Sequence, residues 1–136
     1  MGLGVLSSLS SMSSGTADGT AFASEAEYHT IADAHLEEVQ DILEALEDEM
    51  DDIDINYSMG VLNIDLGSTG FWVLNKQTPN RQIWWSSPIS GPRRYEYSTD
   101  DKAWVSTREP EAGGKRDLRK EIAREIGEAT GVVLDS

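Results

Sequence analysis

The chain of 136 residues has 25 acidic and 11 basic side chains, a net charge of −14, and no cysteine. This length suits one domain. Without cysteine there can be no disulfide, thiolate zinc site, cysteine-ligated cluster or cysteine nucleophile. No apolar run approaches the roughly 20 residues that a membrane-spanning helix needs, so we expect no membrane segment.

The acidic charge is concentrated in one half of the sequence. Residues 1–75 contain 15 Asp or Glu and no Lys or Arg, whereas residues 76–136 contain ten acidic and eleven basic residues. This distribution argues against nucleic-acid binding, because half of the protein would repel the phosphate backbone. A cationic partner, either a metal ion or a basic protein surface, fits the asymmetry better.

The first 24 residues are rich in Ser, Gly, Thr and Ala, with too few apolar side chains to pack into a core. We predict that residues 1–24 form a disordered tail or the remnant of a targeting segment, and that residues 25–136 form the folded domain. A mitochondrial transit peptide is also Ser-rich, but it is normally rich in Arg, which this segment lacks.

A helical period begins at Glu25 and continues to about residue 50. Its apolar residues recur at steps of three and four, which predicts one long amphipathic helix. We expect Ser24 to cap this helix, with Glu27 completing a capping box. The apolar positions are Tyr28, Ala32, Leu36, Val39, Leu43, Leu46 and Met50.

The apolar period then changes to two, which predicts short β-strands separated by Gly-, Pro- and Asn-containing turns. A second amphipathic helix is expected over residues 118–130, with Asp117 as its N-cap and Gly131 at its end. The predicted strands cover residues 52–58, 61–66, 71–77, 81–87, 93–98 and 103–106.

Consecutive strands joined by tight turns form an antiparallel sheet, because parallel pairing needs long crossover connections. The two amphipathic helices need an apolar surface, and one face of the sheet supplies it. We therefore predict an α+β fold: a two-layer α/β sandwich with the N- and C-terminal helices packed on one face of an antiparallel five- to six-stranded sheet.

Five carboxylates on the first predicted helix recur at steps of 4, 4, 3 and 4, away from the apolar stripe. A solvated helix face is one explanation, although such faces usually mix charges of both signs. No basic residue in this half of the sequence offsets the repulsion between these carboxylates. The five residues are Asp33, Glu37, Asp41, Glu44 and Asp48; with the flanking Glu38, Asp52 and Asp54 we call them the acidic ridge.

The alternative is a surface that collects hard cations such as Fe, Mn, Ca or Mg ions. A convex row cannot close a coordination sphere, so the predicted affinity is modest and water completes each site. His29 could add a nitrogen ligand, whereas we expect His35 to be a plain surface histidine. The predicted metal ligands are His29, Asp33, Glu37, Glu38, Asp41, Glu44, Asp48, Asp52 and Asp54.

Strand alternation divides residues 71–87 between two faces of the sheet. One face suits the core and carries Trp72, Leu74, Ile83 and Trp85. The other carries amide side chains around one aromatic ring, a composition typical of protein-interaction surfaces: Asn75, Gln77, Gln82 and Trp84. The alternative is that a side chain from the next strand, such as Arg94, simply covers Trp84.

The segment NKQTPNRQIWWSSPISGPRRYEY, preceded by GVLNIDLG and by an acidic helix that begins with YH, resembles the frataxin family, in particular its eukaryotic, fungal-like branch. The resemblance covers about residues 25–131. It implies an α–β–α sandwich, weakly bound iron, Fe(II) or Fe(III), at the acidic ridge, and a location in the mitochondrial matrix. Thr30, Ile31 and Ala34 stand where relatives often carry further acids, so the first turns of the ridge are thinner.

The resemblance also implies a role in mitochondrial iron–sulfur cluster assembly. Frataxins dock on the complex of cysteine desulfurase and iron–sulfur scaffold protein, and they are described as iron chaperones with ferroxidase activity. The predicted partner-binding residues are Asn75, Gln77, Asn80, Gln82, Trp84 and Arg94. We expect a monomer that can oligomerise with iron. Three functions stay open: a regulator of cluster assembly, a ferroxidase that stores or detoxifies iron, and a metal-independent interaction module.

Overall fold

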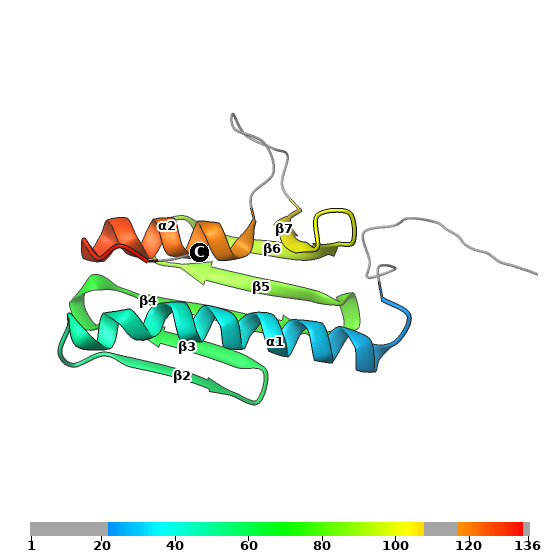
Figure 1. The fold of residues 1–136 in the computed structure, drawn as a ribbon, viewed down its shortest axis with the longest axis horizontal. Helices are drawn as coiled ribbons and strands as arrows, with labels where there is room; N and C mark the ends of the chain where they lie inside the picture. The colour runs from blue at the N-terminus through cyan, green and yellow to red at the C-terminus, as the bar shows by residue number, and fades with distance from the viewer. Residues whose placement is uncertain (1–21, 108–116, 135–136) are drawn as a thin grey trace, which may run out of the picture.

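The computed structural model describes residues 22–107 and 117–134. Two helices cover one face of a six-stranded antiparallel sheet whose strands follow one another in sequence order (Figure 1). This two-layer α+β sandwich confirms the predicted fold class. The elements are α1 (Glu25–Leu43), the 3-10 helix η1 (Glu44–Asp48), β2 (Asp54–Ser58), β3 (Val61–Asp65), η2 (Gly67–Thr69), β4 (Phe71–Gln77), η3 (Thr78–Asn80), β5 (Gln82–Ser87), β6 (Gly91–Ser98), β7 (Ala103–Ser106) and α2 (Leu118–Thr130).

The N-terminus of α1 has the predicted cap. The Ser24 side chain accepts a hydrogen bond from the Glu27 amide at 3.1 Å, whereas the Glu27 carboxylate accepts one at 2.8 Å from the amide of Ala23 rather than from that of Ser24, as a standard capping box would. The expectation of one continuous helix to about residue 50 is wrong, because α1 ends at Leu43 and the tighter η1 follows. Acidic side chains here repel one another and the negative end of the helix dipole, and no basic residue stands in the last turn.

The core lies between the helices and the sheet. The four residues assigned to the core from strand alternation are buried: Trp72, Leu74 and Ile83 are 0% exposed and Trp85 is 2% exposed. Six apolar positions of the first helical stripe are also fully buried, and burial of each leucine or valine among them stabilises the fold by about 1.5–3 kcal/mol. They are Tyr28, Ala32, Leu36, Val39, Leu43 and Leu46.

The folded part of the chain reaches further towards the N-terminus than the predicted boundary at residue 25. Phe22 is 9% exposed, and its ring centroid lies 5.5 Å from those of Tyr28 and Tyr97 and 5.8 Å from that of Trp104. Phe22 therefore belongs to the core rather than to a disordered tail. The rest of that predicted tail, residues 1–21, lies outside the described residues.

Helix α2 closes the same layer beside α1. Asp117 accepts hydrogen bonds from the amides of Arg119 at 2.8 Å and Lys120 at 3.2 Å, as expected of an N-cap. Gly131 ends the helix with a φ of 77°, a left-handed conformation that glycine adopts without steric strain. Neither helix in the described ranges is long and apolar enough to cross a bilayer.

Candidate functional site

The acidic ridge runs along the solvent side of α1 and η1 and continues to the start of β2. Seven of its eight residues are exposed: Glu37, Glu38, Asp41, Glu44, Asp48, Asp52 and Asp54. Across residues 22–107 and 117–134, no three His, Asp or Glu side chains are grouped so that they could hold one metal ion. A cation on this ridge would therefore contact one or two carboxylates at a time and keep most of its water ligands.

Asp33 is the member of the ridge that differs. It is half-buried, and its Oδ1 accepts a hydrogen bond from the Lys76 ammonium at 2.8 Å and another from the Tyr57 hydroxyl. Burial acts to raise the pKa of the Asp33 carboxyl, but the hydrogen bonds from Lys76 and Tyr57 outweigh it and lower the pKa below the usual range. Asp33 is thus a paired carboxylate rather than an open one.

Two basic side chains from the other half of the sequence nevertheless reach the ridge in three dimensions. Lys76 comes from β4, and Arg119 of α2 places a guanidinium nitrogen 3.5 Å from a carboxylate oxygen of Glu38. Both bases lie in the second half of the sequence, and only the packing of the sheet and α2 against α1 brings them to the ridge. Within the described residues, the remaining ridge carboxylates make no ion pair with a basic side chain: Glu37, Asp41, Glu44, Asp48, Asp52 and Asp54.

The two histidines occupy opposite environments. The side chain of His29 is 36% exposed, with Nε2 3.6 Å from a carboxylate oxygen of Glu25, and it lines a hollow of about 510 Å³ with Asp33 and Glu37. His35, expected on the surface, is only 9% exposed because it lies on the core side of α1 near Trp104. Burial lowers the pKa of His35 to about 4, so its imidazole is neutral at physiological pH.

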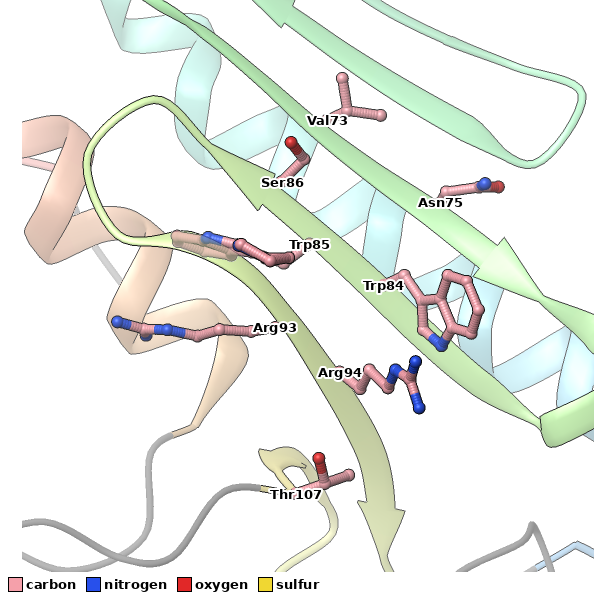
Figure 2. Close-up of a pocket in the computed structure, with 9 residues that line it drawn as sticks. Val73, Asn75, Trp84, Trp85, Ser86, Arg93, Arg94 and Thr107 are labelled. Atoms are coloured by element: carbon pink, nitrogen blue, oxygen red, sulfur yellow. The ribbon is translucent and has the colours of Figure 1, made fainter.

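The uncovered face of the sheet carries the second candidate surface. Asn75, Trp84 and Arg94 are register partners on β4, β5 and β6, and they form one row across three strands (Figure 2). The Arg94 guanidinium lies 4.8 Å from the centre of the Trp84 ring, within the range of a cation–π interaction. Trp84 stays partly exposed, and Asn75 and Arg94 are exposed. We call this row, with Gln77 and Asn80, the sheet-face surface.

Gln82 does not present its amide outward as predicted. It is 8% exposed: its side-chain nitrogen donates to Glu96 at 3.0 Å, and its side-chain oxygen accepts a hydrogen bond from the Trp84 indole at 2.7 Å. Gln82 therefore holds the Trp84 ring in place from the side. Gln77, its register partner on β4, is partly buried, and Asn80 is exposed in η3.

A groove of about 510 Å³ surrounds the row and includes residues that the sequence reasoning missed. Ser86, Pro92 and Thr107 line it, and continued alternation along β5 and β6 would have identified the first two; Val73, which alternation places on the same face as Asn75, lines it as well. Arg93 and Arg94 are divided between the two sheet faces just as Trp85 and Trp84 are. Arg93 points back towards α2 (Figure 2), where its guanidinium lies 2.9 Å from Glu121.

A sequence model described as a frataxin-like domain matches residues 21–132. The chain belongs to the frataxin-like family. It is 49% identical over 85 residues to the mitochondrial frataxin homolog of Schizosaccharomyces pombe, covering 61% of this chain and 54% of that protein. It is 40% identical over 126 residues to the mitochondrial frataxin of Arabidopsis thaliana, covering 89% of this chain and 65% of that protein.

Among solved structures, the chain is similar to trimeric frataxin from the yeast Saccharomyces cerevisiae in complex with ferrous iron. That match has a TM-score of 0.62 and 34% sequence identity, and it covers 74% of this chain and 86% of the yeast chain. The frataxin resemblance is thereby confirmed, and the names of the two curated relatives confirm the expected mitochondrial localisation. The matched region spans between about half and two thirds of these two relatives' own length.

Proposed function

We propose that this frataxin-family chain binds iron at the acidic ridge and regulates iron–sulfur cluster assembly by docking on a cysteine desulfurase–scaffold complex in the mitochondrial matrix. The row of Asn75, Trp84 and Arg94 across the open sheet face carries this proposal. An aromatic ring with an adjacent arginine is the composition that dominates binding energy at protein interfaces. A ring that served only the fold would be expected on the helix-covered face, where Trp72 and Trp85 lie.

Trp84 was expected either to be exposed for a partner or to be covered by Arg94. Arg94 covers part of the ring and leaves the rest exposed. An Arg–Trp pair held by Gln82 is a rigid, partly apolar surface that loses little conformational entropy on binding. Its cationic group suits a partner that presents carboxylates. The row of Asn75, Trp84 and Arg94 lies on the opposite side of the sheet from the helices (Figure 2), so iron and the partner need not compete for space.

Iron at the ridge is supported by two observations. The exposed carboxylates supply the hard oxygen ligands that iron accepts, and the similar yeast frataxin was solved in complex with ferrous iron. The scattered arrangement of these ligands favours weak, exchangeable binding, as suits an iron chaperone rather than a protein with a resident cofactor. The trimeric state of the yeast relative supports the ability of this chain to oligomerise.

A ferroxidase that stores or detoxifies iron is the second candidate. Dedicated iron-oxidising centres place several carboxylates around one cavity, as in helix bundles. The described part of this chain offers no such group of three, so iron oxidation would proceed on loosely held ions. Oxygen consumption per iron, compared with that of an unrelated protein of equal acidity, tests this candidate. A metal-independent interaction module would stimulate the desulfurase without binding iron.

The decisive experiment separates the two surfaces. Trp84→Ala is expected to abolish stimulation of a purified desulfurase–scaffold complex while leaving Fe(II) binding unchanged. Ile89→Ala is a matched control, because Ile89 is a 64% exposed apolar residue in the turn after β5. Stimulation that survives Trp84→Ala would contradict the docking assignment. Equal loss in both variants would mean that the effect is not specific to the row.

A further inference from the structure

Lys76 connects the two layers of the molecule at the N-terminal end of the acidic ridge. It lies on β4 between Asn75 and Gln77, and alternation directs its side chain to the helix-covered face, together with Trp72 and Leu74. The side chain is 11% exposed, although lysine is normally a surface residue. Its carbon stem passes Gly60 in the β2–β3 turn, where an added Cβ would lie 3.7 Å from two of its atoms.

The Lys76 ammonium occupies a position from which a metal ion would approach the Oδ1 atom of Asp33. Nζ lies 2.8 Å from Asp33 Oδ1, and the Tyr57 hydroxyl donates to the same oxygen. The hollow around them is also lined by His29, Glu37 and Thr78. This end of the ridge therefore already holds a cation, supplied by the chain itself.

A tethered cation and a diffusing one compete for the same carboxylate. The ammonium repels a second positive charge in the hollow, and this repulsion is stronger in a partly buried place than in bulk water. Because Lys76 belongs to the chain, its local concentration is constant and does not fall when free metal ions are scarce. A divalent ion can take the Oδ1 atom of Asp33 only by displacing Lys76, which would leave the ammonium partly buried without its partner.

We propose that Lys76 acts as a built-in competitor of divalent cations, which removes Asp33 from the iron-binding part of the ridge and keeps affinity at that end low. The inference rests on the proposed function, since it sets the strength of iron binding at the ridge. Iron then binds first from Glu37 towards the C-terminal end of α1. Lys76 is therefore a residue that determines affinity, although it is not itself a ligand.

The test compares Lys76→Met with Lys102→Met, a control that removes an exposed lysine from the β6–β7 turn and changes the net charge equally. Anaerobic Fe(II) titration by calorimetry is expected to show about tenfold tighter binding for Lys76→Met and a change within about twofold for the control. Mn(II), as a paramagnetic probe, should broaden the amide signals of Gly60 and Thr78 at lower concentration in Lys76→Met than in the parent.

Two further variants identify Asp33 as the carboxylate concerned. Asp33→Asn alone is expected to leave Fe(II) affinity within about twofold of the parent, because Asp33 is already paired. In the double variant Lys76→Met/Asp33→Asn, the increase in Fe(II) affinity expected for Lys76→Met should disappear. Lys76→Gln provides a second neutral replacement, and amide spectra establish that each variant is folded before titration.

The outcomes separate this inference from the proposed function. If the parent binds Fe(II) as tightly as Lys76→Met does, the inference is wrong, and iron binding at the ridge still stands. Binding by Lys76→Met without binding by the parent would support the inference and overturn the iron-binding role of the natural protein. If no variant binds Fe(II), both are wrong. A loss of affinity in Asp33→Asn as large as that in Glu37→Gln would also overturn the inference.

Discussion

Trp84 and Trp85 are adjacent in the sequence and lie on opposite faces of β5. Trp85 is 2% exposed against the helix layer, whereas the ring of Trp84 lies on the open face beneath the Arg94 guanidinium, 4.8 Å from its centre. The two rings therefore have separate physical roles: one fills the core and the other is part of a surface.

Alanine substitution should separate these roles. Trp85→Ala leaves a cavity in the core and is expected to lower the free energy of unfolding by about 3–5 kcal/mol. Trp84→Ala removes a partly exposed ring and one cation–π contact, so we expect a loss of about 1 kcal/mol. Urea unfolding followed by circular dichroism measures both. Equal losses would mean that Trp84 is a core residue and that the open face is not a docking surface.

Neutralising the exposed part of the ridge should stabilise the fold while weakening iron binding. Glu37→Gln, Asp41→Asn and Glu44→Gln together relieve like-charge contacts on one helix face, each worth a few tenths of a kcal/mol. We expect a higher melting temperature and weaker Fe(II) binding by titration. Asp33→Asn is the comparison, because it breaks the pair with Lys76 and should lower stability by about 1 kcal/mol. An unchanged Fe(II) titration for the triple variant would mean that the ridge is only a solvated helix face.

His35 should make the stability depend on pH in the weakly acidic range. Its pKa is about 4 in the folded protein and about 6.5 when unfolded, so the unfolded state binds more protons between these values. The contribution of the neutral His35 imidazole to the free energy of unfolding is therefore fully present above about pH 6.5. It is lost as the pH falls towards 4, by about 3 kcal/mol in total. We expect His35→Gln to lack this component in urea unfolding at a series of pH values. His29→Gln, on a partly exposed residue of the same helix, is the control and should retain it.

The β2–β3 turn contains a residue whose backbone is strained. Met59 has a φ of 52° and a 98% exposed side chain, and Gly60 follows with a φ of 79°. Asn tolerates this left-handed conformation better than Met does, and Asn-Gly is the preferred pair when both turn residues have positive φ. Met59→Asn is expected to raise the free energy of unfolding by about 0.5–1 kcal/mol. Thermal unfolding measures this change. Ser58→Asn, at the strand position before Met59, is the control and should not raise the stability.

Much of the sheet-face surface could be predicted from the sequence because strand geometry is local. Alternation with a period of two places Asn75 and Trp84 on one face and Trp72 and Trp85 on the other, wherever the strands are paired. Gln82 shows the limit of this rule. Alternation gave its face correctly, but its contact with Glu96 on the neighbouring strand decided that its amide is covered.

The two errors in the first helix, its length and the position of His35, also arise from contacts between elements that periodicity does not encode. The apolar stripe was correct through Leu46, because burial follows helical periodicity in both α1 and η1. The change to a 3-10 helix at Glu44 depends on how the chain leaves α1 for β2, which no repeat in the sequence encodes. His35 was misplaced because a lone polar residue at the margin of the stripe can lie on either side, and the packing of Trp104 decided it.

The sequence by itself determined the strands, the two faces of the sheet and the accumulation of negative charge on the first helix, because each of these follows from spacing along a regular backbone. Only the tertiary structure decided which charges remain open. Lys76 and Asp33 are 43 positions apart, and their 2.8 Å contact exists because β4 passes beneath α1 in the packed layers. Charge neutralisation depends on distances in space, and periodicity within one element carries no information about the partner that another element brings to it.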